Sequence, residues 1–110
     1  MQKPSKNSRI MYIECKDESL NGAARIGRVT FSKTSLTIYY KGRKFYRIRG
    51  FKSNYQESST RDEYWISGPR RDGRDRLYAS NIPVEIDQDV RDEYWTEIRK
   101  EPKLKSRRQT

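Results

Sequence analysis

Short runs rich in hydrophobic residues, typical of β-strands, fill the first half of the chain, and in the second run the hydrophobic and polar residues alternate. One run covers residues 9–16 and the next covers residues 24–32. Between them, the pair Asn21-Gly22 is the strongest short hairpin signal in the sequence. Gly27 interrupts the second run and predicts a bulge or a bend there, as small curled sheets need.

Two further strands are predicted at residues 36–40 and 45–49, joined around Gly42, and their register decides which side chains face the core. A connection of odd length puts on one face Leu36, Ile38, Tyr40, Tyr46 and Ile48. The opposite face then carries Thr37, Tyr39, Phe45, Arg47 and Arg49. A two-residue turn would instead mix Arg47 and Arg49 with the apolar side chains. Because burying an unpaired charge is costly, we predict the odd register, with an apolar core face and an aromatic, basic outer face.

The second half of the chain predicts three more short strands, at residues 63–67, 76–78 and 84–86. Residues 50–61 are rich in Ser, Asn and Gln and predict a loop. Residues 70–75 consist of Arg, Asp and Gly and predict an exposed turn. Together with the strands above, these segments predict a sheet of five to seven short strands.

Residues 87–100 predict an amphipathic helix with Asp87 as its N-cap. The apolar positions recur every four residues, at Val90, Tyr94 and Ile98. Residues 85–97 hold six acidic residues and one basic residue, so the helix is strongly acidic. If the helix packs against the basic sheet face, it covers that face. The sequence does not decide whether it does.

The pentapeptide Arg-Asp-Glu-Tyr-Trp occurs twice, at residues 61–65 and at residues 91–95. The first copy runs into the end of a predicted strand, whereas the second lies within the helical pattern. Because no other part of the flanking sequences matches, we interpret the repeat as a coincidence. In both copies we expect the Tyr and the Trp in the core rather than in a ligand site.

The expected architecture is α+β: a small curled antiparallel sheet or SH3-like barrel of five to seven short strands, with one C-terminal helix. A net charge of +10 and only 19 Leu, Ile, Val and Phe residues are typical of disorder. Eight Tyr and two Trp, however, supply large rings that can build a core. We therefore expect one compact domain at residues 9–101, between a flexible basic arm at residues 1–8 and a disordered basic tail at residues 102–110.

The sequence lacks the side chains that most enzymes use. It has no histidine, which removes the commonest general base and the commonest transition-metal ligand. Cys15 is the only cysteine and is expected to be a buried structural thiol in a strand. Asp72 and Asp75 around Gly73 predict a turn rather than a calcium loop, and no phosphate-binding loop is present. We expect a non-enzymatic protein without metal or cofactor, located in the cytoplasm because no apolar run approaches the length of a membrane span.

Residues 19–56 contain no acidic residue but nine Arg or Lys residues, interleaved with aromatic ones. Cationic groups beside flat rings favour a ligand that carries phosphates and bases. We predict a module that binds nucleic acid, DNA or RNA, with little sequence preference. Its arginines and lysines contact phosphates, while Tyr39 and Phe45 stack on bases. The candidate residues are Arg25, Arg28, Tyr39, Lys41, Arg43, Lys44, Phe45, Arg47, Arg49, Arg70 and Arg71.

A protein partner is the alternative, because an acidic protein surface would also fit a basic, aromatic face. The chain would then be an accessory subunit or an adaptor. The two hypotheses differ in their salt dependence, which is steep for nucleic acid. No membrane partner is expected, and the oligomeric state is left open.

Residues 9–16, 24–34, 63–69 and 83–87 read RIMYIECK, ARIGRVTFSKT, EYWISGP and PVEID. These strings resemble a family of short bacterial proteins, and the resemblance extends over residues 9–100. The family is uncharacterised, and its members are often labelled 1-deoxy-D-xylulose-5-phosphate synthase. That enzyme is several times longer and binds thiamine diphosphate with magnesium through a Gly-Asp-Gly motif, which this chain lacks. The label does not fit this sequence, and the resemblance implies no catalytic residue here.

Overall fold

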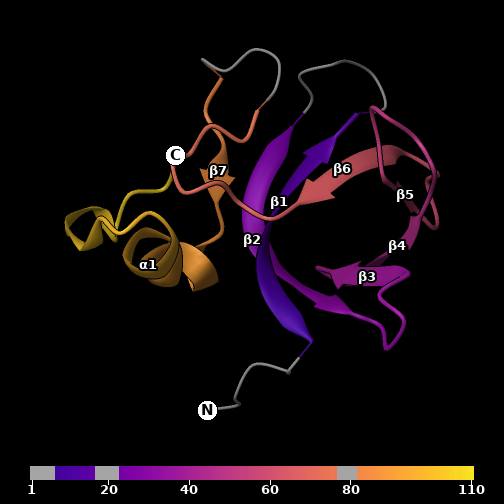
Figure 1. The fold of residues 1–110 in the computed structure, drawn as a ribbon, viewed down its shortest axis with the longest axis horizontal. Helices are drawn as coiled ribbons and strands as arrows, with labels where there is room; N and C mark the ends of the chain where they lie inside the picture. The colour runs from indigo at the N-terminus through magenta and orange to yellow at the C-terminus, as the bar shows by residue number, and fades with distance from the viewer. Residues whose placement is uncertain (1–6, 17–22, 77–81) are drawn as a thin grey trace.

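Six β-strands form a closed antiparallel barrel, and a seventh strand and a C-terminal helix lie outside it (Figure 1). The computed structural model describes residues 7–16, 23–76 and 82–110. The strands are β1 (Ser8–Cys15), β2 (Ala24–Phe31), β3 (Thr37–Tyr40), β4 (Arg43–Arg47), β5 (Tyr55–Glu57), β6 (Glu63–Ser67) and β7 (Glu85–Ile86). Their order around the barrel is β1-β6-β5-β4-β3-β2, and pairing of β2 with β1 closes the ring. The predicted α+β small barrel with one helix is therefore confirmed, whereas the turn at residues 21–22 and most of the strand at residues 76–78 lie outside the described residues.

Strand β2 pairs with β1 along nearly its whole length, without the bulge that Gly27 suggested. On its other edge, the first half of β2 pairs in parallel with β7, and the second half pairs with β3. Gly27 lies between these halves, where the side chains of Tyr40 and Asp87 approach the backbone. A Cβ atom at Gly27 would lie 2.6 Å from Cε1 and 2.8 Å from Oη of Tyr40. Glycine is needed here for this close approach rather than for a bulge.

Side chains from all six barrel strands fill the barrel interior. The buried members are Met11, Ile13, Val29, Ile38, Tyr40, Phe45, Tyr55, Tyr64 and Ile66. The rings of Phe45 and Tyr64 meet edge to face, with 4.9 Å between their centroids. Cys15 lies in β1, as predicted, and packs against this cluster as a free thiol that is partly rather than fully buried.

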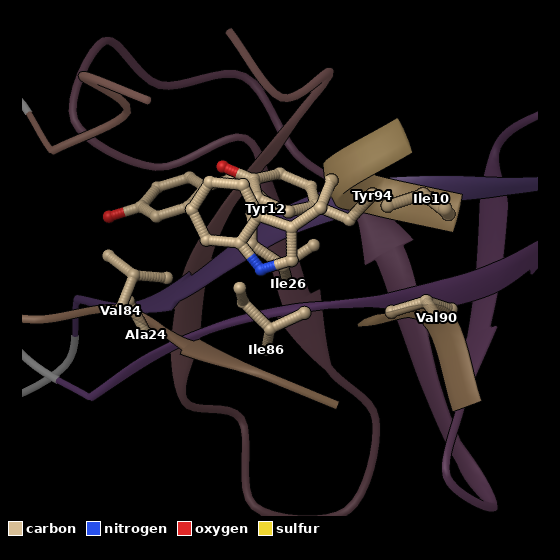
Figure 2. Close-up of a cluster of buried hydrophobic side chains, with 9 residues drawn as sticks. Ile10, Tyr12, Ala24, Ile26, Val84, Ile86, Val90 and Tyr94 are labelled. Atoms are coloured by element: carbon tan, nitrogen blue, oxygen red, sulfur yellow. The ribbon is translucent and has the colours of Figure 1, made fainter. Parts of the chain in front are cut away.

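A second hydrophobic core lies between the outer side of β1 and β2 and the C-terminal segment (Figure 2). Its buried members are Ile10, Tyr12, Ala24, Ile26, Val84, Ile86, Val90, Tyr94 and Trp95. Successive strand residues point to opposite faces, so even-numbered residues of β1 and β2 face this core while odd-numbered ones face the barrel interior. Both faces of these two strands are thus covered, which explains the continuous apolar run at residues 10–13.

The C-terminal helical segment begins with the 3-10 turn η1 (Gln88–Val90), continues as α1 (Arg91–Glu93) and ends in the π-helical turn η2 (Tyr94–Ile98). Val90 and Tyr94 are buried in the second core, as the four-residue spacing predicted. Asp87 precedes this helical segment, but its side chain makes no capping hydrogen bond. The carboxylate of Asp87 instead accepts hydrogen bonds from the hydroxyl of Tyr40 and from Nε of Arg25.

Residues 102–110 are not a disordered tail, which corrects the sequence-based expectation. After the 3-10 turn η3 (Pro102–Leu104), the chain returns to the edge of β7. Nε1 of Trp95 donates to the carbonyl of Arg107 at 2.9 Å, and the amide of Thr110 donates to the carbonyl of Val84 at 3.0 Å. At the other end, Ser8 already belongs to β1, and residues 1–6 of the predicted arm lie outside the described part of the chain.

The β3–β4 register is the even one, so the predicted odd register is wrong. Tyr40 pairs with Arg43, which leaves a two-residue turn of Lys41 and Gly42 with φ angles of 50° and 75°. Two consecutive positive φ angles are typical of the hairpin turn whose twist matches that of the flanking strands. Phe45 consequently faces the interior opposite Ile38, while the outer side carries Tyr39, Lys44 and Tyr46.

The even register does not bury arginine, because both arginines of β4 lie at the margins of the interior. Arg43 lies over the rings of Phe45 and Tyr64, 5.7 and 5.8 Å from their centroids. Arg47 lies 5.7 Å from the ring centroid of Tyr55 and stays exposed. Contacts between cations and ring faces stabilise such positions without full desolvation. The cost that favoured the odd register is therefore avoided.

One predicted loop contains a short strand, and the repeated pentapeptide lies in two different elements. Strand β5, which pairs with β4 and β6, lies in the predicted loop at residues 50–61. The first Arg-Asp-Glu-Tyr-Trp copy ends in β6 and the second lies in the helical segment, so the same five residues adopt two conformations. Tyr64, Tyr94 and Trp95 are buried, and Trp65 is partly buried against the second core. Treating the repeat as a coincidence is consistent with this outcome.

Candidate functional site

The outer side of the β3–β4 hairpin presents two tyrosine rings beside a lysine. We call Tyr39, Lys44 and Tyr46 the outer β3–β4 face. Tyr39 lies directly opposite Lys44, and Tyr46 lies opposite Thr37, so the two tyrosines are diagonal neighbours. Tyr39 is 42% exposed and Tyr46 is 48% exposed. The strand register alone sets this arrangement, because alternate residues of each strand share a face.

Both tyrosine rings of the outer β3–β4 face are unengaged. In the described part of the chain, neither ring stacks on another ring or lies under a cation, in contrast to the rings of Phe45, Tyr55 and Tyr64. An exposed ring without a neighbour keeps both its flat faces free for a planar ligand group.

Unpaired cations lie on the hairpin and in the loop that follows it. Lys44, Arg47, Arg49 and Lys52 are exposed and make no ion pair with any described residue. Gln56 of β5 lies opposite Tyr46, and Glu63 of β6 lies opposite Gln56. The carboxylate of Glu63 accepts a hydrogen bond from the hydroxyl of Ser53. The positive field at the hairpin is therefore not cancelled by carboxylates within the hairpin itself.

Arg25 and Lys41, two of the predicted phosphate contacts, are neutralised by Asp87 at one end of the barrel. Oδ1 of Asp87 lies 2.6 Å from Nε of Arg25 and 3.3 Å from Nζ of Lys41. The hydroxyl of Tyr40 donates to the same carboxylate, and burial, followed by this hydrogen bond, raises the pKa of Tyr40 above its usual value of 10.0. This cluster stabilises the junction of β3 with β7 rather than a ligand.

Arg28 and Arg43 also have acidic partners. Nη2 of Arg28 lies 2.7 Å from Oε1 of Glu93 on the helical segment. Nε of Arg43 lies 3.7 Å from Oε1 of Glu57. The backbone amide of Thr60 is the main cause that lowers the pKa of Glu57, to about 2, and the hydroxyls of Ser59 and Thr60 add to it.

Phe45 does not offer a stacking face, contrary to the prediction. Its side chain is 1% exposed and packs against Tyr64 inside the barrel. Tyr46 occupies the outward position that the wrong register gave to Phe45. The signal that could have identified Tyr46 is the Lys41-Gly42 pair, since glycine in a short connection favours a two-residue hairpin turn.

Arg70 and Arg71 lie on a different part of the molecule from the hairpin. Nη2 of Arg70 pairs with Asp72 at 3.2 Å within the turn at residues 70–75. Arg71 lines a groove of about 490 Å³ together with Arg9, Arg28 and Lys100, and with two glutamates of the helical segment. Arg71 can add to the overall positive field, but the structure does not bring it to the outer β3–β4 face.

Phe51 is a further exposed aromatic residue that was not among the predicted site residues. It lies in the loop directly after β4 and is 90% exposed. Nζ of Lys52 lies 5.9 Å from its ring centroid. Leu36, just before β3, is 58% exposed. The hairpin and its flanking loops thus carry all the large apolar side chains that are exposed among the described residues.

The acidic helical segment does not cover the outer β3–β4 face. It packs on the even-numbered side of β1 and β2, where Arg28 meets Glu93. In Figure 1 the helix lies beyond β2 and β7, whereas β3, β4 and β5 form the opposite wall of the barrel. The acidic helix therefore does not cover the basic sheet face, and the outer β3–β4 face is accessible.

Comparisons with family models, with curated proteins and with solved structures find no match to this chain. No helix among the described residues is long and apolar enough to cross a membrane. The described residues contain no group of three or more Cys, Asp or Glu side chains arranged to hold a metal ion. In the turn around Gly73, which has a φ of 77°, the backbone amide of Arg74 donates to Oδ1 of Asp72, and the backbone amide of Arg70 donates to Oδ1 of Asp75.

Proposed function

We propose that this protein is a small non-enzymatic module that binds nucleic acid through the outer β3–β4 face, with little sequence preference. The observation that carries this proposal is the pair of exposed, unengaged rings of Tyr39 and Tyr46 around Lys44. Arg49 and Lys52 in the loop after β4, and Arg47 at the margin of the barrel interior, are further exposed cations without acidic partners in the described residues.

The chemistry of this face fits a polyanion that carries flat bases. Exposed lysines and arginines contact phosphates and release counterions, and this contribution is independent of sequence. Tyrosine rings stack on any base, because every base has a π-face. Neither kind of contact reads base edges, so the face discriminates weakly between sequences.

Fluorescence anisotropy with a labelled oligonucleotide, titrated across a salt series, tests the proposal. If Lys44, Arg47, Arg49 and Lys52 each contact one phosphate, the slope of log affinity against log salt is about −3 for a single strand. Affinity should then fall by about 50-fold between 50 and 200 mM salt. Absence of binding at moderate salt by a folded sample would refute the proposal.

A charge-reversal pair tests whether the hairpin is the site. Lys44→Glu with Arg49→Glu changes the net charge at two exposed positions of the hairpin and its loop, and should weaken binding at least tenfold. Lys103→Glu with Lys105→Glu makes the same change in charge at exposed positions of the C-terminal segment, and should weaken binding much less. Thermal melts should show both variants folded. Equal losses for the two pairs would mean that binding follows net charge only and that the face is not the site.

An acidic protein partner is the second candidate, because Leu36 and Phe51 expose apolar surface beside the cations. Exposed apolar side chains within a charged rim are typical of protein interfaces. Tight binding to a protein ligand that survives high salt, together with no binding to oligonucleotides, would favour this candidate over the first.

A further inference from the structure

The two tyrosines of the outer β3–β4 face indicate whether its ligand is single-stranded or double-stranded. We infer that this face binds an unpaired strand, with separate bases stacked on Tyr39 and Tyr46, rather than a duplex. The inference rests on the proposed function and deepens it, because it names the class of nucleic acid. DNA and RNA single strands share the required chemistry, namely phosphates and bases whose faces are free.

Tyr39 and Tyr46 occupy positions on the sheet whose spacing suits separated bases. Diagonal neighbours on one face of an antiparallel pair lie about 7–8 Å apart, and Tyr39 and Tyr46 are such neighbours. Bases that remain stacked along one strand are only about 3.4 Å apart, with no room for a protein ring between them. A strand whose bases are unstacked can place one base on each ring.

The position of the hairpin in the barrel is the second argument. A two-stranded β-ribbon can enter the major groove of a duplex, but only if it protrudes from the protein. Strand β3 is flanked by β2 and strand β4 by β5, so the hairpin forms part of a continuous barrel wall. The wall can approach a duplex only along its phosphates. The tyrosine rings would then have no base face to stack on.

Phe51 provides a third ring next to this wall. It lies in the loop after β4, is nearly fully exposed and lies between the cations Arg49 and Lys52 in the sequence. A ring between two cations fits a single strand, because the ring can stack on a base while the cations contact the neighbouring phosphates. We assign Phe51 as an extension of the stacking surface.

Three labelled probes of equal length separate stacking from charge. They are a single DNA strand, the same strand in a duplex, and an abasic strand that keeps the sugar-phosphate backbone but has no bases. The single strand should bind at least tenfold more tightly than either of the others at the same salt concentration. An RNA strand of the same sequence should bind within about tenfold of the DNA strand, because both present free base faces.

Ring variants provide the second readout. Tyr46→Ala and Phe51→Ala should each weaken single-strand binding about tenfold and leave the weak binding of the abasic strand unchanged. Tyr46→Phe keeps the ring and should retain the wild-type affinity. Retained affinity of Tyr46→Phe would show that the ring, and not the hydroxyl, is required. Unchanged binding of the abasic strand by Tyr46→Ala would exclude a structural role, and because Tyr46 is half exposed its ring can be removed without opening the core.

The outcomes distinguish failure of this inference from failure of the proposed function. If the duplex or the abasic strand binds as tightly as the single strand, the inference is wrong while nucleic-acid binding stands. If Tyr46→Ala lowers binding to all probes equally, the rings do not stack on bases and the inference is also overturned. If no probe binds, the proposed function itself fails.

Discussion

Three buried carboxylates decide which basic residues remain available to a ligand. Glu14 pairs with Lys16 at 2.6 Å, Glu57 pairs with Arg43, and Asp87 pairs with Arg25 and Lys41. A buried charge needs an opposite charge and hydrogen bonds, so these cations have structural roles. Four of the cations that no carboxylate neutralises in the described residues lie on the β3–β4 hairpin and the loop after it, namely Lys44, Arg47, Arg49 and Lys52, and others, such as Lys103 and Lys105, lie on the C-terminal segment.

Glu57 predicts a measurable pH dependence of stability. The pKa of its carboxylate in the folded protein is about 2, below its ordinary value of 4.5, because the amide of Thr60 donates to the charged form. A lowered pKa stabilises the fold fully above about pH 5, and this contribution is lost as pH falls toward 2. Glu57→Gln should therefore make the free energy of unfolding less dependent on pH between 5 and 2, as urea titrations at several pH values would show.

The control for this prediction is Glu97→Gln. Glu97 is exposed on the helical segment, so its substitution should preserve the pH dependence of the unmodified protein. A Glu57→Gln variant that follows the same pH curve as the control would show that Glu57 does not link folding to protons.

The β3–β4 hairpin shows how a turn determines the function of the strands that it joins. A one-residue change in register moves every side chain of a strand to the opposite face. Here the turn at Lys41 and Gly42 requires two residues in the left-handed region, and glycine adopts this conformation without strain. The turn thereby places Phe45 in the core and Tyr46 outside.

Gly42→Ala tests the importance of this turn. A Cβ atom at Gly42 would meet no neighbouring atom, so any loss of stability comes from its φ angle of 75° alone. We expect the free energy of unfolding to fall by about 1 kcal/mol, measured by urea titration. Gly68→Ala is the matched control, because its φ is not in the left-handed region and a new Cβ would make only ordinary contacts there. A neutral Gly42→Ala variant would contradict this account of the turn.

At the scale of the whole molecule, β1 and β2 form a wall between two hydrophobic cores. The barrel interior lies on one side, and the C-terminal segment covers the other (Figure 2). Because the acidic helical segment is held on β1 and β2 by this second core, it stays away from β3 and β4. The accessible positive face is thus a consequence of where the C-terminal segment packs.

Removal of residues 107–110 tests the role of the ordered C-terminal segment. These residues accept hydrogen bonds from Trp95 Nε1 and from the amide of Ile86, and donate one from Thr110 to Val84. At about 1 kcal/mol for each hydrogen bond, the truncated chain should lose about 3 kcal/mol of stability, measured by urea titration and thermal melting. Lys103→Ala with Lys105→Ala removes two charges from the same segment and should have little effect. A truncation without effect would show that these contacts do not stabilise the fold.

Local patterns predicted most of the elements but only part of the site. The first two strands, the strand at residues 63–67 and the helical segment were predicted because their hydrophobic periodicity is local. Strand β5 was missed because it has three residues and one buried ring, Tyr55, and its polar neighbours resemble a loop. Tyr39 was predicted on the outer face, whereas Phe45 was placed there wrongly through the register, and Lys44, predicted only as a phosphate contact, lies there instead.

The sequence by itself determined the succession of short strands and one C-terminal helix and the excess of positive charge, because strand and helix periods and residue charges are properties of the chain alone. Only the tertiary structure decided which cations are free, which tyrosines face outward and which side of the barrel the acidic segment covers. These outcomes depend on partners that are distant in sequence, such as Asp87 for Arg25 and Glu57 for Arg43. A side chain's availability is set by what packs against it, and no local pattern contains that information.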